Sequence, residues 1–311
     1  MTEETQENFL IVSHSNRLKE LINTFGPRPI PENIKRIENC GILLLTIIKK
    51  NEDFCEVTLE LLDMGGGAAI QAASNTEKYT VEKRTAELLP NIILKHGTSY
   101  NFFIVRHGEG DHNIKTMSNK MTNLTRSDPS LTSKGIEQAK KAGRILKKYF
   151  EENKYDRTKI IYFVSILQRT HQTLLYILSE FVSESPIKSY TATILPKSEE
   201  FSSFGNPGKE NTSLCINNKT NPPCSNISYD DINLTMDWSF YNNYSKNSGN
   251  MISLAIQKKE GTMPLTDNSN FGSLIKDILH KLFTAKMSGG KYRAKHRSNK
   301  TKRSNKTTKK R

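Results

Sequence analysis

Long hydrophobic runs are missing from this 311-residue sequence. The longest apolar stretch, residues 41–48, is interrupted by Thr46 and is far shorter than the roughly 20 residues that a helix needs to cross a bilayer. Residues 1–14 are acidic and lack the basic flank and apolar stretch of a secretory signal. From these absences we expect a cytoplasmic protein without a membrane span.

Cysteine is also scarce, with four residues in the chain: Cys40, Cys55, Cys215 and Cys224. They form no Cys-x-x-Cys pair and have no histidine nearby at metal-ligand spacing, which argues against a disulfide framework. We therefore expect four reduced thiols. The interval between Cys215 and Cys224 leaves a zinc pair or a loop disulfide open as alternatives.

Acidic residues are absent from residues 291–311, which hold 11 of the 46 lysines and arginines and most of the net charge of +14. This tail lacks apolar periodicity, so we expect it to be disordered. Its charge favours a polyanion, with nucleic acid as the first candidate and an anionic membrane surface or an acidic protein next. Tyr292 is its only aromatic residue, so we expect nonspecific binding without base stacking. Alternatively, the tail serves solubility or localisation alone.

Apolar strand patterns and amphipathic helix patterns alternate along the chain, which predicts an α/β fold with a mostly parallel central sheet and helices on both faces, a three-layer αβα sandwich. A hairpin is expected between two of the segments, at 42–48 and 54–62. The other strands are predicted at residues 9–12, 101–105, 159–165 and 190–195, and the helices at 17–25, 132–150, 169–181 and 271–283.

We predict one domain over residues 1–285 and a basic tail over residues 286–311. A flexible connection is expected at residues 63–100, where a glycine-rich run is followed by polar residues. Residues 201–250 are rich in Asn, Ser, Gly and Pro and predict a long loop, with ordered turns at 238–244.

The second of the predicted strands runs directly into Arg106-His107-Gly108-Glu109, with Asn113 six residues after the histidine. Open α/β sheets bind their ligands at the carboxyl edge of the strands, where these side chains would lie. A neutral imidazole is a good nucleophile toward phosphorus, and the fork of an arginine matches the oxygens of a phosphoryl group. The pattern indicates a phosphoryl-binding site.

Residues 105–109 with Asn113 resemble the signature of the histidine phosphatase superfamily, the phosphoglycerate-mutase-like proteins. Two further blocks resemble the same family in the same order, residues 128–135 with Gln138-Ala139 and residues 164–170 with Gln172-Thr173. The resemblance implies catalysis through a phosphohistidine, with no cofactor and no metal.

The family's second catalytic histidine should follow a later strand, yet none of the histidines downstream of Arg169 follows an apolar strand. A matching strand and histidine lie instead at residues 9–18, and residues 39–42 resemble the segment that trails that histidine. We therefore interpret the chain as circularly permuted, with residues 9–62 supplying the family's last third. This hypothesis predicts His14 and His107 on neighbouring strands around one anion.

The resemblance implies that His107 attacks phosphorus while Arg106, Arg169 and His14 surround the phosphoryl oxygens. Asn113 would donate a further hydrogen bond to the substrate or phosphate.

Less certain members adjoin this set. Gly108 and Arg17 flank the two histidines, and Ser15 replaces the glycine that usually follows the second one. The acid that protonates the leaving oxygen is expected at Glu200, with Glu199 as the alternative.

Three functions remain open. The first is a phosphomonoesterase acting on a small phosphorylated substrate. The second is a phosphoglycerate-mutase-type phosphotransferase, and the third a degenerate, non-catalytic member that binds polyanions through its tail. The tail's composition also resembles the basic tails of giant-virus proteins, which would place a viral member in the host cytoplasm or the virion.

Overall fold

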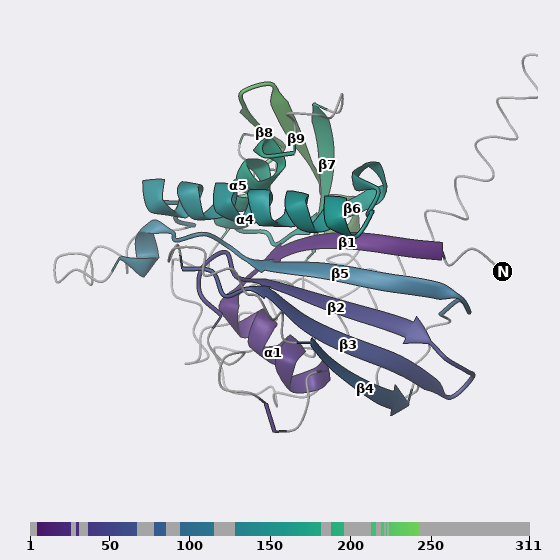
Figure 1. Ribbon diagram of the computed structural model, residues 1–311. Coiled ribbons are helices and arrows are strands. Elements are labelled where there is room, and N and C mark those ends of the chain that lie inside the picture. Colours follow the sequence, from purple (N-terminus) through teal and green to yellow (C-terminus); the bar gives the residue numbers. More distant parts are fainter. Residues whose placement is uncertain are drawn as a thin grey trace, which may run out of the picture.

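The computed structural model describes residues 5–25, 29–30, 37–66, 78–84, 94–114, 128–181, 188–195, 213–215, 219–220, 222 and 224–242. In these ranges the chain forms a mixed α/β fold around one nine-stranded sheet, ordered β4-β3-β2-β5-β1-β6-β7-β9-β8 (Figure 1). The predicted helix at 271–283 and the tail at 286–311 lie outside the described residues. None of the described helices is long and apolar enough to cross a membrane.

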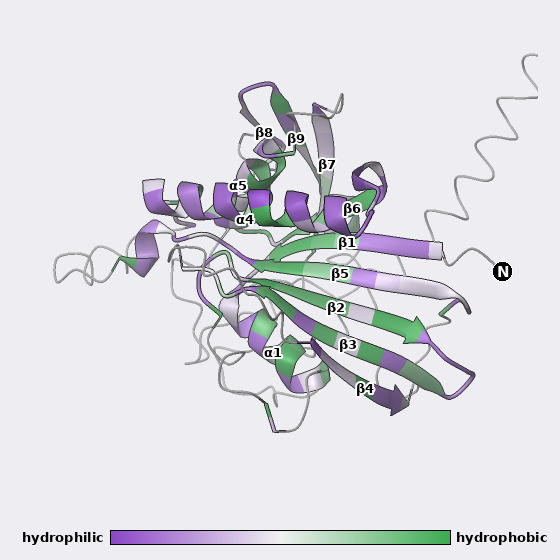
Figure 2. Cartoon of the chain, viewed as in Figure 1, coloured by the Kyte–Doolittle hydropathy of each residue, from purple (hydrophilic) through white to green (hydrophobic). Residues whose placement is uncertain are grey.

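Five parallel strands form the centre of the sheet, in the order β5-β1-β6-β7-β9. The carboxyl-terminal half of β1 is apolar and buried, whereas its first residues are polar and exposed (Figure 2). The central strands are β1 (Thr5–Ser13), β5 (Thr98–Arg106), β6 (Ile160–Val164), β7 (Ser189–Ile194) and β9 (Ile232–Asp237).

Antiparallel strands complete both edges of the sheet. On one edge lie β2 (Ile42–Lys49), β3 (Phe54–Asp63) and β4 (Lys78–Arg84), and on the other lies β8 (Asn226–Tyr229). The predicted hairpin at 42–62 is therefore present. The prediction of a mostly parallel sheet holds for the centre but is wrong for the whole described sheet. The antiparallel pairs are β2–β3, β2–β5, β3–β4 and β8–β9. Short connections such as the one between β2 and β3 allow no crossover and so impose antiparallel pairing.

Two segments predicted to lack regular structure contain strands. The predicted connection at 63–100 includes β4, which pairs with β3 from Phe54↔Arg84 to Glu60↔Lys78. The predicted loop at 201–250 includes β8 and β9, joined by a turn in which Asp230 has a positive φ of 50°. Only alternate residues of β9 are buried, and its exposed positions are polar, so composition concealed the strand.

In the described residues, three helices cover the sheet. Leu18, Leu21, Ile22 and Phe25 of α1 (Ser15–Phe25) are buried in one apolar cluster, as their spacing predicts. The helices α4 (Ser133–Glu152) and α5 (Gln168–Ser179) contribute to the other cluster. Thr132 caps α4, because its hydroxyl accepts a hydrogen bond from the Gly135 amide at 3.0 Å. Two short 3₁₀ turns are η1 (Asp111–Asn113) and η2 (Arg157–Lys159).

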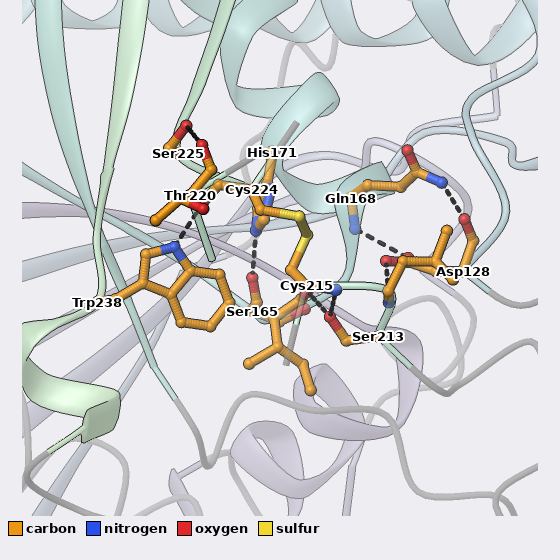
Figure 3. Close-up of a disulfide and its surroundings, with 12 residues drawn as sticks. Asp128, Ser165, Gln168, His171, Ser213, Cys215, Thr220, Cys224, Ser225 and Trp238 are labelled. Carbon is orange, nitrogen blue, oxygen red and sulfur yellow. Dashed lines mark hydrogen bonds between the residues drawn. A yellow bond between two sulfur atoms is a disulfide. The ribbon is translucent and has the colours of Figure 1, made fainter. Parts of the chain in front are cut away.

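Cys215 and Cys224 form a disulfide beside Trp238 (Figure 3). The expectation that all four cysteines are reduced is therefore wrong for this pair, whereas Cys40 and Cys55 are free and buried. The two disulfide cysteines are nine positions apart, and the Trp238 indole donates to the Cys224 carbonyl. The loop before β8 thus brings the two thiols together, which their sequence spacing alone did not establish.

Candidate active site

The two histidines of the sequence analysis follow neighbouring parallel strands. β1 and β5 pair in register up to Ser13↔Arg106, so His14 and His107 leave the same edge of the sheet. The His107 amide donates to the Ser13 carbonyl at 2.9 Å, which extends the pairing to the histidines themselves. Their rings lie 5.0 Å apart, centroid to centroid, at an angle of 62°. Residues 93 positions apart in the sequence thus face one another.

The hydrogen bonds of His107 select one tautomer of its ring. Its Nδ1 lies 2.7 Å from the Gly108 carbonyl oxygen, which can only accept, so Nδ1 carries the proton. The Arg169 Nε then donates to the ring Nε2 at 3.4 Å. The Nε2 lone pair therefore points toward the guanidinium, which is the arrangement that an attack on phosphorus from Nε2 needs.

A third strand end contributes to the same cluster. Ser165 directly follows β6, and its Oγ lies 2.7 Å from His14 Nε2. The same Oγ accepts from the Leu167 amide at 3.2 Å, which holds the hydroxyl in place. The sequence analysis missed Ser165 as a site residue, although it lies within the motif at 164–170.

Burial keeps the imidazoles uncharged. His14 is 0% exposed and His107 1% exposed, and burial lowers the pKa of both well below 6.5, with the charge of Arg169 as the next cause. A third imidazole, that of His112, lies 5.7 Å from His107, and burial followed by Arg169 lowers its pKa to about 3. Three neutral imidazoles beside a buried guanidinium leave the cluster with a positive charge, and the unprotonated Nε2 of His107 accepts its hydrogen bond from Arg169.

Three arginines surround this cluster. Arg169, from the first turn of α5, and Arg17, from the first turn of α1, are 0% and 2% exposed. Arg106 donates from Nη1 to the Ile37 carbonyl at 2.8 Å, and its charge depresses the pKa of His107 and of His112. Such a concentration of guanidinium groups around nucleophilic nitrogens suits a phosphoryl group.

Residues 102–189 match the family model of the histidine phosphatase superfamily, branch 1. The chain is thus similar to this superfamily over less than a third of its length. That segment includes His107 and Arg169, while His14 lies outside it.

Part of the chain is also similar to proteins named as phosphoglycerate mutases. The chain is 40% identical over 77 residues to the 2,3-bisphosphoglycerate-dependent phosphoglycerate mutase of Rhizobium rhizogenes, covering 25% of the chain and 31% of that protein. It is 37% identical over 87 residues to the enzyme of that name from Afipia carboxidovorans, covering 28% and 37%. The enzyme of that name from Lactobacillus acidophilus is 38% identical over 77 residues, covering 25% and 29%. The chain thus matches about a third of the length of these relatives. No solved structure matches.

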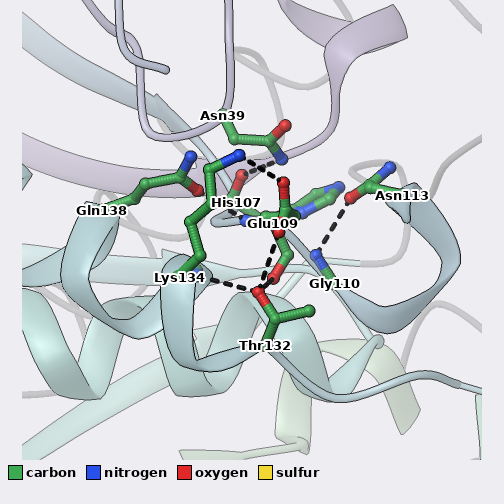
Figure 4. A network of polar contacts seen from close by, with 9 residues as sticks. Asn39, His107, Glu109, Gly110, Asn113, Thr132, Lys134 and Gln138 are labelled. Atoms are coloured by element: carbon green, nitrogen blue, oxygen red, sulfur yellow. Dashed lines mark hydrogen bonds and ion pairs between the residues drawn. The ribbon is translucent and has the colours of Figure 1, made fainter. Parts of the chain in front are cut away.

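The loop after His107 is held against the start of α4 (Figure 4). The Glu109 carboxylate accepts from Lys134 Nζ at 2.9 Å and from the Thr132 hydroxyl at 3.1 Å, and the Glu109 amide donates to Gln138. The Asn39 side chain donates to the His107 carbonyl at 3.0 Å. These contacts fix the backbone on both sides of the histidine.

The tight approach of this loop to α4 explains two glycines. A Cβ on Gly108 would lie 2.5 Å from the Gly135 carbonyl oxygen, and a Cβ on Gly135 would lie 2.1 Å from that of Glu109. Both distances are impossible for real atoms, so neither position accepts a side chain without a shift of the loop. Gly108 therefore acts through packing, and its amide donates to the Thr173 hydroxyl at 3.0 Å.

Asn113 lies near the cluster but serves the turn in this structure. Its Oδ1 accepts from the Gly110 amide at 3.0 Å and closes η1 (Figure 4). Ser15 begins α1 beside His14 and is partly exposed. Glu199 and Glu200 lie outside the described residues, so the predicted acid stays a prediction.

Asp128 is a buried group to which the sequence analysis gave no role of its own. It is 1% exposed, and its Oδ1 accepts from the Gln168 amide at 2.9 Å at the start of α5. Burial raises its pKa to about 6, despite the hydrogen bond from Gln168 and the charge of Arg169. Its other oxygen accepts from Leu214 at 3.2 Å, which connects the disulfide segment to the helix that carries Arg169.

Proposed function

We propose that this protein is a phosphomonoesterase that hydrolyses a small phosphorylated substrate through a phosphohistidine on His107. The observation that carries the proposal is the His107 ring, which lies 5.0 Å from the His14 ring and whose Nε2 accepts from Arg169 Nε. The similarity to the histidine phosphatase superfamily and to proteins named as mutases supports the choice of phosphoryl chemistry.

In the first step, the Nε2 lone pair of His107 attacks phosphorus, and the bond from phosphorus to the ester oxygen breaks. The leaving oxygen takes a proton from a carboxylic acid, for which Glu200 is our first candidate and Glu199 the second. In the second step, water attacks the phosphohistidine and returns a proton to that carboxylate. Inorganic phosphate leaves, and His107 regains its lone pair.

The positive groups around His107 stabilise the charge that builds on the phosphoryl oxygens. Arg169 would contribute most, because it is fully buried and donates toward the reacting nitrogen. Arg106 and His14 would complete the set, with Ser165 holding the His14 ring. Asn113 would donate to the substrate from Nδ2, because its Oδ1 accepts from the Gly110 amide. Because both catalytic imidazoles are buried, the site must open for substrate to enter.

The position of β1 supports our proposal of a circular permutation. β1 lies between β5 and β6, although its start at Thr5 precedes Thr98 of β5 by 93 residues and Ile160 of β6 by 155. The family match begins within β5 and includes β6. Residues 9–62 would then supply the family's second histidine through His14. The two apolar clusters, one with α1 and one with α4 and α5, fit the proposed three-layer sandwich.

Turnover of p-nitrophenyl phosphate by the full chain tests the proposal. We expect activity that persists with EDTA and disappears in His107→Ala, and a drop of about 100-fold to 1000-fold in kcat in Arg169→Ala. His96→Ala is the matched control, since His96 is an exposed histidine before β5, and it should keep full activity. Acid quenching with ³²P-labelled substrate should trap label on the wild type but not on His107→Ala. Absence of turnover across a broad panel of phosphate esters would refute the proposal.

A mutase is the second candidate, because the similar proteins are named as phosphoglycerate mutases. Labelled phosphoglycerate separates the two. Label that appears in an isomer of the substrate indicates a phosphotransferase, and label in inorganic phosphate indicates hydrolysis. A protein that forms no phosphoenzyme and yet binds polyanions would be the degenerate member.

The basic residues 291–311 support a separate proposal, nonspecific binding of nucleic acid or another polyanion. Such binding would hold the enzyme on a polyanionic surface in the cytoplasm or in a virion.

A further inference from the structure

α5, the helix that carries Arg169, is capped from a distant part of the chain. Its N-cap residue is Leu167, whose apolar side chain cannot accept from the first amides of the helix. Asp128, 40 positions before Gln168, takes this role, because its Oδ1 accepts from the Gln168 amide at 2.9 Å (Figure 3). The Asp128 carbonyl also accepts from the Gln168 side chain. The start of the helix is thus held by a separate segment.

Asp128 is itself fixed on a second side. It is 1% exposed, and its Oδ2 accepts from the Leu214 amide at 3.2 Å. The next residue, Cys215, is bridged to Cys224, which ties this donor to the rest of the fold. Asp128 also has a positive φ of 52°, a conformation that Asp, Asn and Gly adopt more readily than other residues. Its backbone and its carboxylate are therefore both held in one arrangement.

A second hydrogen bond joins the same two segments one turn further along α5. The Leu131 amide donates to Gln172 Oε1 at 2.8 Å. Gln168 and Gln172 are four positions apart, so they lie on one face of the helix. The bonds hold this face against residues 128–131 at two successive turns, which fixes the rotation of α5 about its axis.

The adjoining face of α5 meets the nucleophile. Arg169 lies about 100° around the helix from Gln168, and its Nε donates to His107 Nε2 at 3.4 Å. One turn on, the Thr173 hydroxyl accepts from the Gly108 amide at 3.0 Å. Arg169 and Thr173 are both 0% exposed, so this contact lies inside the protein. A rotation of α5 would therefore carry the guanidinium away from His107.

We propose that Asp128 is a positioning residue, which aims Arg169 at His107 by fixing the rotation of α5. The bond between Leu131 and Gln172 is the second point of attachment. The inference rests on the proposed function for its effect on turnover, but not for its effect on the place of the Arg169 side chain.

The hydrogen bonds of Asp128, and not its charge, carry this role. Burial raises the pKa of Asp128 to about 6, and the hydrogen bond from Gln168 and the charge of Arg169 oppose that rise. The two charges are thus close enough to interact, and a negative charge beside Arg169 weakens the positive potential that a phosphoryl group meets. Removal of the charge alone should therefore not lower turnover, whereas loss of the bonds should.

Turnover of p-nitrophenyl phosphate by variants of the full chain tests this role. Asp128→Gly tolerates the positive φ, removes both carboxylate bonds and should lower kcat about 10- to 100-fold by displacing Arg169. Asp128→Asn gives up the charge but keeps an acceptor for the Gln168 amide, so kcat should return to within about threefold of the wild type. Equal kcat in Asp128→Gly and the wild type, or an equal loss in both variants, would overturn the proposal.

Asp156 provides the matched control. It caps the short turn η2 by accepting from the Thr158 amide at 3.0 Å, the same kind of bond at a different place. Asp156→Gly should therefore leave kcat unchanged. In an Arg169→Ala background, Asp128→Gly should lower kcat less than about twofold, because the side chain that it positions is gone. An undiminished loss in that background would overturn the proposal.

A measurement without substrate reports the position of Arg169 directly. Its Nε–H signal in a proton–nitrogen correlation spectrum, identified by its absence in Arg169→Lys, should shift or broaden in Asp128→Gly and return in Asp128→Asn. An unchanged signal in Asp128→Gly would overturn the proposal. If the wild type hydrolyses no phosphate ester and the signal still behaves as expected, the proposed function fails and the positioning role stands.

If Asp128→Gly does not fold, Gln172→Met replaces it in both measurements. It removes the acceptor for the Leu131 amide and keeps the length of the side chain. We expect a kcat about 10-fold lower and a displaced Arg169 signal, and an unchanged kcat and signal would overturn the proposal.

Discussion

Three buried imidazoles make the stability of this protein depend on pH. Burial, and then the charge of Arg169, holds the pKa of His14 and His107 well below 6.5 and that of His112 at about 3. Unfolding exposes these rings and restores their ordinary pKa of about 6.5. Below that pH the three imidazoles bind protons in the unfolded chain but stay neutral in the folded chain. The free energy of unfolding therefore falls as the pH falls.

The size of the loss follows from the same pKa values. Between pH 7 and pH 5, His112, with its folded pKa of about 3, lowers the free energy of unfolding by about 2 kcal/mol, and His14 and His107 act in the same direction. Asp128 acts in the opposite direction, because its folded pKa of about 6 lies above its ordinary value of 3.8. The folded chain gains that proton first, which adds about 1 kcal/mol of stability at pH 5. The loss from His112 therefore exceeds the gain from Asp128, and the depressed pKa of His14 and of His107 adds to the loss.

Urea unfolding at pH 7, 6 and 5 measures this dependence. His112→Asn removes one of the three groups, so the loss between pH 7 and pH 5 should shrink by about 2 kcal/mol. His96→Asn, at an exposed position, should leave the loss unchanged. A free energy of unfolding that stays within about 1 kcal/mol over this range, in a protein where His112→Asn also changes nothing, would refute the reasoning.

Three further predictions concern packing, the disulfide and the tail. Gly135→Ala should destabilise the protein by about 1 to 3 kcal/mol and lower phosphatase turnover about 100-fold by moving the loop after the catalytic histidine, whereas Gly97→Ala, with φ +66° and open space around it, should keep turnover. Equal turnover in both variants would contradict this. Replacing Cys215 and Cys224 by serine should lower the free energy of unfolding by about 2.5 to 3 kcal/mol for a loop of this length; a Tm that dithiothreitol does not change would oppose it. Deleting residues 286–311 should move elution from a heparin column to lower salt. Unchanged elution would refute the proposal that the tail binds polyanions.

The central strands and main helices could be predicted because their signals are local. α1 has its apolar residues at helical spacing, and β1, β5, β6 and β7 are compact apolar runs, so periodicity located them. β4 and β9 could not be found in this way. β4 reads Lys-Tyr-Thr-Val-Glu-Lys-Arg, a polar edge strand whose pairing depends on β3, and β9 depends on β7. Tertiary pairing determines such strands more than their own residues do.

Some residues of the candidate site could likewise be predicted from local motifs, and others could not. His107 and Arg169 lie in motifs, so residue type and spacing suggested them, and His14 was found because a strand and histidine occurred where the family pattern was incomplete. Ser165 and Asp128 were missed because their roles come from distant partners: His14 is 151 positions from Ser165, and Leu214 is 86 positions from Asp128. No local pattern reports such contacts.

The order of strands in the chain is secondary to their order in the sheet. The cluster needs β5, β1 and β6 as parallel neighbours, so that His107, His14 and Ser165 leave one edge together, and nothing in those contacts depends on which strand comes first. The pairing of β1 with β5 runs over nine residues and ends at the site, so the register that builds the core also places the imidazoles. A permuted chain would keep this geometry as long as its new connection leaves the three strand ends unchanged. The sheet therefore accounts for both the stability and the chemistry we propose.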